Sequence, residues 1–551
     1  MANCGDQSLS GEGKSAVENN VAGGAIVLRH AGNKLTLKVC SFSGNTAPNG
    51  CGGVIGAQKP GSTITVNEGT TFTGNESYFQ GGVIFTLGNL TINGSATGRV
   101  EFKNNKTLHT TRNYSQGGAI WVGGSTSESV IKYALFKGND AGVESTDGYS
   151  AGGALRASTA KKVTVENCEF TENRGANGNA FSYSNCTEEC VFTDCNFHDN
   201  IGMSGPNKDG SASRFYGGAG EMTAGTARFE RCTFKDNKAR SHSGVLHFNN
   251  ATVNEVTVTP TVSFTDCLFE GNNCLSQSTA NSTAVTNNGG GCFKFTDGMK
   301  MTLNRCVFKN NQGNNRGAVF QLGANDVLFM NQVTFTGNNL TASGNIWGVN
   351  IHSNKSVVCM NNVTSFNNSA PNAGNHYSFN SDGGWIVTNS TFVDNCTTGV
   401  LRANNTSGNG TRKSVFCNNI FINKNTANNV LTISTSLTSA GHNLFSCSSA
   451  PSNLTMDASD KTGITALNNE SYSDSGYLGQ YSWTNNLSGF NPATAAIVED
   501  AIKSDEEAVG SLTPNVGLDF YNWLNSIGAL GKDARGETRG TPWWPGAYQQ
   551  N

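Results

Sequence analysis

The chain has 551 residues, a net charge of −3 and only 14% charged residues, well below the average of about 25%. It has no basic stripe, so nucleic acid is excluded as a partner. No apolar run of about 18 residues occurs, so no membrane span is expected. The first residues, Met1–Asp6, lack the apolar segment of a signal peptide. The low charge, the many Asn, Ser, Thr and Gly and the 16 Cys still predict an extracellular or cell-surface protein.

The chain begins in the middle of a repeating unit, at Asn20–Ile26, where Gly23-Gly24 is already the second half of the repeat. The end of a stacked β-structure exposes unpaired backbone, which natural proteins cover. Either upstream sequence has been removed, or another subunit covers this end. The second alternative predicts end-to-end self-association, which builds an open filament when it does not close into a ring.

A two-part phrase then recurs along most of the chain: Phe-x-x-Asn, followed by Gly-Gly-Ala/Val-Ile/Leu. A fixed phrase at a period of about 25–40 residues indicates one supersecondary unit stacked on itself, because a lone unit cannot bury its apolar face. Weaker copies continue to Phe392 and Asn395. The predicted structural ladder begins with Phe42, Asn45, Phe72, Asn75, Phe102, Asn105, Phe136, Asn139, Phe170 and Asn173.

The repeating unit is built from strands, because its apolar residues alternate, as in Leu35–Val39, Val163–Val165 and Val256–Val258. The compact solution is an all-β, right-handed parallel β-helix of roughly a dozen coils, stacked at about 4.8 Å. Each Asn amide would hydrogen-bond along its column, and the Gly pair would fit a corner that needs positive φ or close backbone approach. The signatures of a leucine-rich repeat and of a propeller are absent.

Insertions fall on one side of this unit. The distance from the Gly pair to the next Phe is nearly constant, about 16–20 residues, whereas the distance from Phe to the next Gly pair varies from about 8 to 21, as in a surface loop. The long insertions, 106–116, 140–151, 201–216 and 273–289, would therefore line one edge. They form either a binding face for a glycan or host-surface ligand, or solvated decoration.

The last clear coils end near residue 449, which predicts a β-helix domain over 1–449 and a C-terminal capping region over 450–551. A helix is expected near 492–509, with Asn491 as N-cap, Pro492 at its first position and Gly510 at its end. The aromatic tail predicts a lid on the apolar end of the stack, with a sugar-stacking platform or a subunit contact as alternatives. The expected buried stripe is Ile497, Val498, Ala501 and Ile502, and the tail aromatics and Leu are Phe520, Tyr521, Trp523, Leu524, Trp543, Trp544 and Tyr548.

Six cysteines precede the repeated Phe by two residues and share its buried face, which favours stacked free thiols over disulfides. They are Cys40, Cys168, Cys195, Cys232, Cys267 and Cys306. The disulfide candidates are Cys274 with Cys292, and Cys186 with Cys190.

Asn-x-Ser/Thr sequons predict N-linked glycans and no other prosthetic group. Asn75, Asn105 and Asn395 are discounted because a ladder amide faces a packed corner. The candidate acceptors lie in predicted loops or in the tail: Asn113, Asn281, Asn354, Asn389, Asn405, Asn409, Asn453 and Asn486.

No catalytic, cofactor-binding or metal-ligating residue is predicted. Glycoside hydrolysis requires paired carboxylates, yet no Asp-Asp pair occurs, and the His residues lack metal-ligand spacing. Asp194, Asp236 and Asp266 fit turn chemistry. A polysaccharide lyase or glycosidase on the same scaffold is the alternative function.

The tandem Gly-Gly-Ala-Ile and Phe-x-x-Asn phrases, over about residues 20–425, resemble those of the polymorphic outer membrane proteins. That resemblance implies a right-handed parallel β-helix adhesin exported as an autotransporter. The chain departs from that family at 430–551, where Gly531–Arg539 and Gly546–Tyr548 resemble the closing motif of secreted β-helix repeat proteins. We therefore expect a structural or adhesive surface glycoprotein, stacked head-to-tail into a filament or appendage.

Overall fold

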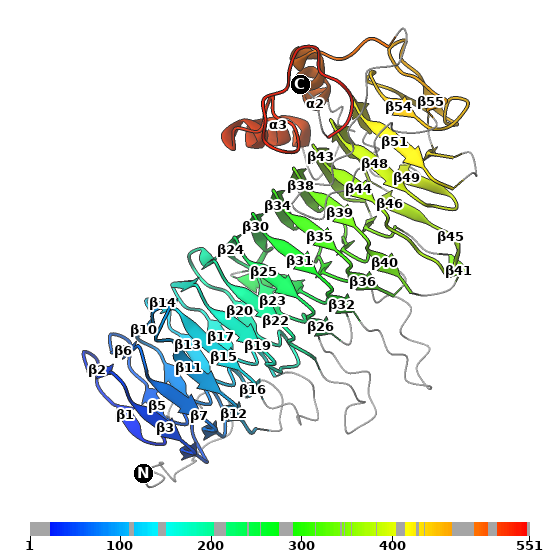
Figure 1. Ribbon diagram of the computed structural model, residues 1–551. Helices are drawn as coiled ribbons and strands as arrows, with labels where there is room; N and C mark the ends of the chain where they lie inside the picture. The colour runs from blue at the N-terminus through cyan, green and yellow to red at the C-terminus, as the bar shows by residue number, and fades with distance from the viewer. Residues whose placement is uncertain are drawn as a thin grey trace. The chain divides into compact units, whose positions relative to one another are not determined.

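The computed structural model describes residues 23–109, 115–141, 150–202, 216–239, 242–253, 255–274, 290–314, 316–341, 344–345, 348–353, 355–381, 383–403, 414–425, 429–434, 436–464, 490–504 and 515–547. Strands dominate it, and three long parallel sheets hold 14, 13 and 14 strands. This arrangement is a parallel β-helix, which confirms the predicted all-β fold class (Figure 1). The chain divides into an N-terminal unit (Met1–Val262, Gly271–Asn288, Cys292–Lys294) and a C-terminal unit (Ser263–Glu270, Gly289–Gly291, Phe295–Asn551).

In the N-terminal unit each coil supplies one short strand to each of three parallel sheets, called sheets A, B and C. Sheet A contains, in spatial order, β1 (Ile26–Leu28), β5 (Ile55–Ala57), β9 (Ile84–Thr86), β13 (Ile120–Gly123), β17 (Leu155–Ser158), β20 (Phe181–Ser184), β23 (Gly220–Thr223), β27 (Leu246–Asn249) and β33 (Phe293–Lys294). Sheet B contains β2 (Lys34–Leu37), β6 (Thr63–Asn67), β10 (Asn89–Asn93), β14 (Glu128–Lys132), β18 (Lys162–Glu166), β21 (Cys190–Thr193) and β24 (Thr226–Glu230). Sheet C contains β3 (Ser41–Ser43), β7 (Thr71–Thr73), β11 (Val100–Lys103), β15 (Ala134–Lys137), β19 (Glu169–Thr171), β22 (Asn196–His198) and β25 (Thr233–Lys235).

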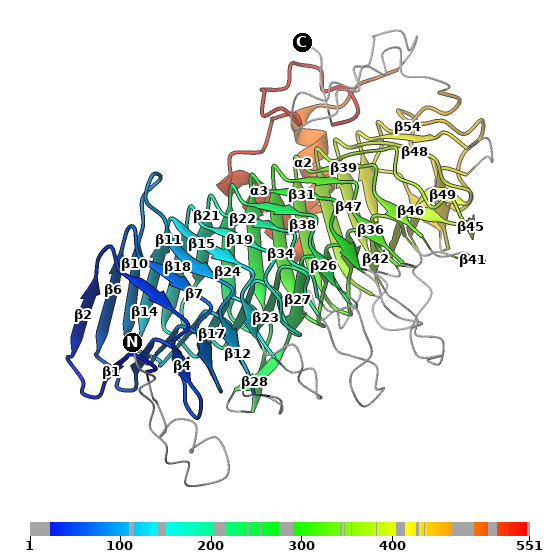
Figure 2. The same cartoon turned by 60° about the horizontal axis from the view of Figure 1, so that its bottom comes forward.

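Short strands mark the corner at which the coil passes from sheet C back to sheet A. One small sheet orders β16 (Asp140–Ala141), β12 (Lys106–Thr107), β8 (Glu76–Ser77) and β4 (Thr46–Ala47), and β26 (Lys238–Ala239) pairs with β32 (Asn273–Cys274). Figure 2 shows β4 and β12 along the same side of the unit. A different corner carries an antiparallel hairpin, β28 (Ala251–Val253) with β29 (Val256–Val258). Val256–Val258 was expected to be a strand of the coil and is instead part of this hairpin.

The C-terminal unit continues the three-strand pattern. Its sheet A strands are β37 (Phe320–Gln321), β42 (Ile351–Ser353), β46 (Tyr377–Ser381), β49 (Gly399–Ala403) and β52 (Leu431–Ile433). Its sheet B strands are β34 (Lys300–Asn304), β38 (Val327–Asn331), β43 (Val357–Asn361), β47 (Trp385–Thr388) and β50 (Val415–Cys417), and β30 (Thr261–Thr265) spans the division between the units. Its sheet C strands are β31 (Leu268–Glu270), β35 (Val307–Lys309), β39 (Thr334–Thr336), β44 (Thr364–Phe366), β48 (Thr391–Asp394), β51 (Ile420–Asn423) and β54 (Leu444–Phe445). Short strands complete it: β36 (Gln312–Gly313), β40 (Asn339–Leu340), β41 (Gly344–Asn345), β45 (Ala373–Asn375), β53 (Leu437–Thr438) and β55 (Leu454–Thr455).

The repeated Phe side chains stack inside the coil. The rings of Phe72 and Phe102 lie 4.9 Å apart at an interplanar angle of 13°, and those of Phe136 and Phe170 lie 4.6 Å apart at 8°. These rings are buried completely. Stacking arises because the strands pair in register, Phe over Phe, at the spacing of one strand.

The repeated Asn side chains form a hydrogen-bonded column. The Asn75 amide donates to Asn105 Oδ1 at 3.0 Å and to the Phe42 carbonyl at 3.1 Å. Asn105 Oδ1 also accepts the backbone N–H of Asn75 at 2.9 Å. The residue just before each Asn turns the chain with positive φ, as at Gly74 (φ 62) and Asn104 (φ 54), so the second x of the phrase is usually Gly, Asn or Asp.

The two glycines of the repeat are required for different structural reasons. Gly81 has φ +65, a conformation that favours glycine. A Cβ on Gly82 would lie 2.0 Å from the carbonyl oxygen of Gly118 in the next coil. Both reasons expected for the Gly pair therefore hold, one for each glycine.

The ladders change in the C-terminal unit. Ser365 of β44 pairs with Phe335 on one side and with Phe392 on the other, so a serine occupies the Phe column there. Asp394 ends the Asn column, accepting the Asn368 amide at 3.0 Å and the Ser365 hydroxyl at 2.6 Å. Burial raises the pKa of Asp394, and these hydrogen bonds oppose that shift. The prediction that Asn395 belongs to the ladder is wrong, because β48 runs straight into Asp394 without the left-handed residue that the other copies have.

Two helices follow the last coils. Helix α2 (Ala495–Lys503) begins after Thr494, whose side chain accepts the N–H of Ile497, so the predicted N-cap at Asn491 is wrong. The predicted terminator Gly510 lies outside the described residues. Val498, Ala501 and Ile502 are buried as expected, whereas Ile497 is 38% exposed. Helix α3 (Val516–Ser526) was not predicted, and it carries Phe520, Trp523 and Leu524 of the expected lid.

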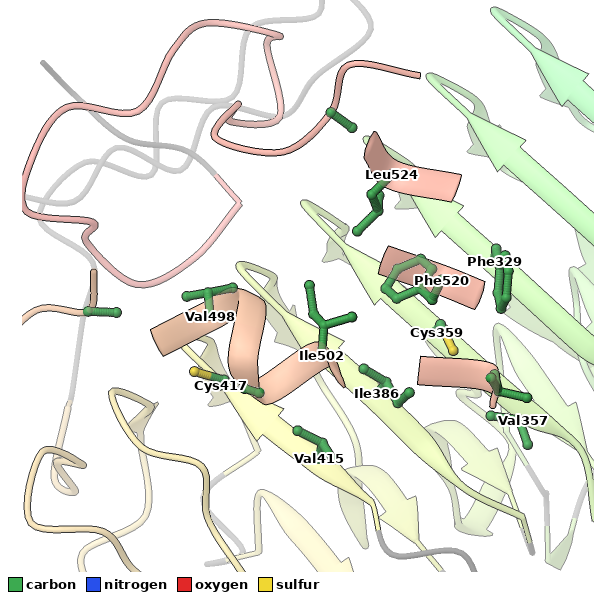
Figure 3. Close-up of a cluster of buried hydrophobic side chains, with 14 of the residues drawn as sticks. Phe329, Val357, Cys359, Ile386, Val415, Cys417, Val498, Ile502, Phe520 and Leu524 are labelled. Carbon is green, nitrogen blue, oxygen red and sulfur yellow. The ribbon is translucent and has the colours of Figure 1, made fainter. Parts of the chain in front are cut away.

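Both helices pack on the outer side of sheet B, not over the end of the stack (Figure 3). Val498, Ile502, Phe520 and Leu524 contact outward-facing apolar side chains of β38, β43, β47 and β50, and Phe329 lies 5.1 Å from the Phe520 ring. Trp544 packs with Phe490 on an apolar cluster of sheet C side chains. The prediction of a lid over the end of the stack is therefore wrong for the described tail residues, which instead cover the outer side of the coil. The side chains beneath α2 and α3 are Phe329, Val357, Cys359, Ile386, Val415 and Cys417.

The closing motif fastens this tail to the coil. Arg539 is 5% exposed and donates to Asn362 Oδ1 and to the Gly546 carbonyl, both at 2.8 Å. Asn362 in turn donates to the Lys532 carbonyl at 2.9 Å, and Gln332 donates to that of Asp533 at 2.8 Å. The motif thus has a structural role, because Arg539 joins the carbonyls of Lys532 and Gly546 in the tail to Asn362 of the coil.

Candidate functional site

The most chemically diverse cluster lies on the outer face of sheet A in the N-terminal unit. The position directly after each Gly-Gly-x-x phrase points outward, because the residue before it, such as Leu155 or Phe181, fills the core. In-register pairing then sets Arg156 beside Ser182, Ser182 beside Glu221, and Glu221 beside His247. We call this set, with Ser184 and Asn249, the sheet A polar row.

Hydrogen bonds connect the row from end to end. Arg156 donates to Ser182 Oγ and, at 2.8 Å, to Ser184 Oγ. Ser182 donates to Glu221 Oε2 at 3.0 Å, and Asn249 donates to Glu221 Oε1 at 2.9 Å. Each Glu221 oxygen thus has a donor, and the guanidinium and the carboxylate are joined through one serine.

The centre of the row is buried, whereas Arg156 and Asn249 are partly exposed. Glu221 is 6% exposed, and burial raises its pKa against the opposing effects of Arg156, Ser182 and Asn249. Burial also lowers the pKa of Arg156, which the Glu221 charge opposes. Burial, aided by the charge of Lys294, lowers the pKa of His247 to about 3, so this imidazole is neutral at ordinary pH.

A ring cluster adjoins the row where the chain returns from the insertion 201–216. The Tyr216 ring stacks on His242 at 4.2 Å and lies 4.5 Å from His247. Burial lowers the pKa of His242 to about 2. The buried Nδ1 atoms of His242 and His247 have no hydrogen-bond partner among the described residues. The cluster therefore places two neutral imidazoles and a phenol ring beside the hydrogen-bonded row that links Arg156 to Glu221 through Ser182.

The row contains one carboxylate, one guanidinium, two hydroxyls, one amide and the neutral imidazole of His247, and the ring cluster adds the imidazole of His242. It does not supply the two carboxylates that glycoside hydrolysis needs. Within the part of the chain that the structure describes, no three His, Cys, Asp or Glu side chains form a group that could hold a metal ion. The chemistry suits the binding of a hydroxyl-rich ligand or the internal fastening of the coil.

A second candidate is a depression of about 670 Å³ on the outer face of sheet C. Arg231 holds Asp194 through two bonds of 2.8 and 2.9 Å, which lower the pKa of Asp194. His198 lies 2.8 Å from Asp199 and 3.2 Å from Glu169. The residues that line the depression are Asp194, Cys195, Asn196, His198, Asp199, Arg231, Thr233, Lys235 and Asp236.

Most of the acidic residues in and near this depression occupy tight turns of the backbone. Asp194, Asp236 and Asp266 have φ of 53, 51 and 56°, so the interpretation of these three as turn residues is confirmed. Asp199 has φ 54° and precedes a ladder Asn, as Asp236 does. Since β22 and β25 pair in register, Asp199 and Asp236 stand in adjacent coils, about one strand spacing of 4.8 Å apart.

The predicted long-insertion edge also has a structural basis. The insertions 106–116, 140–151 and 273–289 start from β12, β16 and β32, and Ile201 bridges to Lys238 of β26. Their return points stack as well, because Gln116 bridges Ala151 and Asn177 bridges Tyr216. The insertions therefore share one corner, as predicted, while residues 110–114, 142–149, 203–215 and 275–289 lie outside the described residues.

Two predicted glycosylation sites lie in the described residues. Asn389 is 3% exposed, and its amide exchanges hydrogen bonds with Asn361 and Asn418 at 2.8 and 2.7 Å. A buried, bonded amide cannot carry a glycan, so the prediction for Asn389 is wrong. Asn453 is exposed and stays a candidate. The other predicted acceptors lie outside the described residues: Asn113, Asn281, Asn354, Asn405, Asn409 and Asn486.

All 15 described cysteines are free thiols. The predicted disulfides between Cys274 and Cys292 and between Cys186 and Cys190 are not formed in this structure. The column of thiols is buried apart from the partly exposed Cys40. Several of its members donate to carbonyl groups one coil away, as Cys168 does to Ile131 and Cys195 to Val165, both at 3.5 Å.

Sequence reasoning missed the sheet A polar row, although a signal was present. Aligning the copies by their Gly pairs places Gly56, Phe85, Trp121, Arg156 and Glu221 at one position. That position changes from aromatic to charged along the chain, while the core positions beside it stay apolar. Phe85 and Trp121 stack at 4.6 Å, which places an aromatic pair directly ahead of the row.

Fold and site together define a parallel β-helix protein that carries polar side-chain clusters on the outer faces of its sheets and long insertions at one corner. None of the described helices has both the length and the apolar character to cross a membrane. No family model, no curated protein and no solved structure matches this chain.

Proposed function

We propose that the protein is an extracellular structural or adhesive surface glycoprotein that presents its long insertions from one edge of the β-helix. The observation that carries this proposal is the stacking of the bases and return points of the insertions at a single corner. A solenoid with insertions on one face commonly uses that face for binding. The repeat's likeness to the polymorphic outer membrane proteins supports an adhesive role.

The test replaces residues 203–215 and 275–289 by short Gly-Ser linkers. The intact and altered proteins, immobilised at equal density, are compared for binding to a glycan array and to cultured cells. We expect a loss of binding of at least about tenfold, since a lost hot-spot contact costs about 2 kcal/mol or more and about 1.4 kcal/mol corresponds to a factor of ten. Shortening the β28–β29 hairpin, which leaves a different corner, is the matched control. Unchanged binding after both replacements, or no binding by the intact protein, would contradict the proposal.

End-to-end association is part of the proposal. Among the described strands, β1, β2 and β3 each pair on one side only, and an unpaired parallel edge can accept another copy. Electron microscopy and sedimentation at rising concentration test this, with Thr36→Pro in β2 as the blocking variant and Val256→Lys on the hairpin as its control. We expect the intact protein to form filaments and the Thr36→Pro variant to form none. Isolated short particles of the intact protein at every concentration would contradict stacking.

A polysaccharide lyase or glycosidase remains the second candidate, favoured by the stacked Asp199 and Asp236 in the sheet C depression. Release of reducing or unsaturated ends from acidic polysaccharides, lost in Asp199→Asn, would support it. The surface-protein proposal expects no release.

The proposal that the protein is a glycoprotein has its own test. We expect its intact mass to fall on enzymatic deglycosylation, and an unchanged mass would reject this part of the proposal.

A further inference from the structure

Within each unit, cysteine side chains stand one above another in adjacent coils, at the corner between sheets B and C. In the N-terminal unit the run is Cys168, Cys195 and Cys232, each directly before its sheet C strand. In the C-terminal unit Cys267 and Cys306 occupy the same place. In-register pairing of β19, β22 and β25, and of β31 with β35, makes these residues neighbours. We call the two runs the thiol column.

The sulfur atoms of the column are oriented alike. Those of Cys168, Cys195 and Cys232 lie 3.2, 3.3 and 3.4 Å from the carbonyl oxygen two residues earlier. The same three sulfurs lie 3.5, 3.5 and 3.7 Å from a carbonyl oxygen of the previous coil. Cys306 has the same two contacts, at 3.5 and 3.6 Å. Because the contacts repeat, neighbouring sulfurs are separated by the step from one coil to the next.

The repeated Phe two residues further along each coil measures that step. The Phe197 ring lies 4.9 Å from the Phe170 ring and 4.9 Å from the Phe234 ring, and those of Phe269 and Phe308 lie 4.6 Å apart. These values agree with the usual strand spacing of about 4.8 Å. Neighbouring sulfurs of the column are therefore about 4.8 Å apart.

This separation suits a metal bridge better than a disulfide. A disulfide needs Cβ atoms about 3.5–4.5 Å apart and sulfurs about 2.05 Å apart, so it would pull adjacent coils out of their spacing. A bond between a metal ion and a thiolate is about 2.3 Å long, so two such bonds in line span about 4.6 Å. Thiolate ligands are soft and select soft ions such as Cu(I).

Burial limits the charge that the column can hold. Cys195 is 2% exposed, and burial raises the pKa of its thiol well above the ordinary value. An ion of charge +1 that replaces one thiol proton leaves the net charge unchanged, whereas uncompensated charge in the interior is costly. The backbone N–H of Ala134 donates to the Cys168 sulfur at 3.3 Å, a bond that a thiolate would strengthen. Cys195 also lines the sheet C depression, which provides an entry path.

We propose that the thiol column binds soft monovalent metal ions of the Cu(I) and Ag(I) class, each held in line between the sulfurs of adjacent coils. The ion forms one bond to a thiolate, whose proton passes to solvent, and a second bond to a lone pair of the neighbouring sulfur. No electron is transferred, and no third ligand is needed. The proposal does not depend on the proposed surface function. Among the described residues, the pairs that supply such positions within one unit are Cys168–Cys195, Cys195–Cys232 and Cys267–Cys306.

The test counts bound ions. The full-length protein is reduced, freed of small thiols, titrated anaerobically with Ag(I), and analysed by native mass spectrometry after gel filtration. We expect at least three ions per chain, with two sulfur neighbours around each in the X-ray absorption spectrum. Cys195→Ala, which introduces the residue that the same corner position already has at Ala134, should bind two ions fewer. Cys292→Ala removes a buried thiol outside the column and is the matched control that should bind as wild type.

A second variant adds a position instead of removing one, so the test does not rest on Cys195→Ala folding normally. Since β15 pairs in register with β19, Ala134 stands next to Cys168. Ala134→Cys should therefore bind one Ag(I) more than the wild type, and titration with Cu(I) kept reduced by ascorbate should show the same differences. Unchanged counts in Cys195→Ala and Ala134→Cys, or three sulfur neighbours per ion, would overturn the proposal.

Discussion

Replacing one ladder asparagine tests how the coils are held together. Asn139 takes part in four buried hydrogen bonds: its amide donates to Phe102 O at 2.9 Å and to Asn173 Oδ1 at 3.0 Å, and its Oδ1 accepts the Asn105 N–H at 3.1 Å and the Asn105 amide at 2.9 Å. Asn139→Ala removes all four and leaves their partners buried. A buried hydrogen bond contributes about 1 kcal/mol net, and an orphaned partner costs about 1–3 kcal/mol. The expected loss is about 4–6 kcal/mol around this coil.

The assay is hydrogen exchange followed by mass spectrometry, because a solenoid opens locally and a single unfolding free energy does not describe it. Peptides containing Asn105 and Asn173 should lose protection, whereas coils several repeats away should not. Lys137→Ala is the matched control, since its ion pair with Glu172 is about half exposed and such pairs contribute about 0–1 kcal/mol. A local loss below about 1 kcal/mol in Asn139→Ala would refute the idea that the Asn column holds adjacent coils together.

Three other changes probe the corners, the lateral cover and the buried imidazole. Gly82→Ala would drive a Cβ to 2.0 Å from the Gly118 carbonyl, so we expect a lower melting temperature or failure to fold, and a wild-type melting curve would contradict this. Phe520→Ala should cost about 3–5 kcal/mol and speed proteolysis of the C-terminal tail, whereas Leu518→Ala, 48% exposed, should cost under about 1 kcal/mol. His247 has its pKa lowered to about 3 in the folded state, so the unfolded state binds more protons between about pH 6.5 and 3, and stability should fall with falling pH by up to about 1.4 kcal/mol per unit. His247→Gln should flatten that slope between pH 6.5 and 4.5 in denaturant titrations, and an unchanged slope would show that His247 is not buried neutral.

The cover over sheet B could have been expected from the sequence. The coil strands of the N-terminal unit alternate, as in Thr63–Asn67, where the outward Thr65 lies between the core residues Ile64 and Val66. Val327–Asn331 and Val357–Asn361 are apolar on both faces. A strand buried on both faces needs a second layer. The loss of alternation after about residue 327 was therefore the signal for helices packed on the outside.

The prediction that the aromatic tail covers the end of the stack was wrong because composition does not specify a packing partner. Density of Trp and Phe shows that a segment is buried, not which surface it covers. Helix α3 was missed because Asn515 and Gly517 at its start are weak helix signals. The prediction for Asn389 fails because the short turn between β47 and β48 has the composition of a loop, although the side chain is buried.

The sequence by itself determined the coil: Phe, Asn and Gly-Gly at a fixed spacing specify one turn of a β-helix, and identical turns can only stack on one another. It also located the insertions at one corner, since spacing along the chain is preserved in a one-dimensional repeat. The tertiary structure decided the rest. Arg156, Ser182, Glu221 and His247 are 26, 39 and 26 residues apart, and only in-register pairing of four sheet A strands makes them neighbours. Packing of distant segments likewise set α2 and α3 against sheet B, because long-range contacts depend on shape and burial, which no local pattern records.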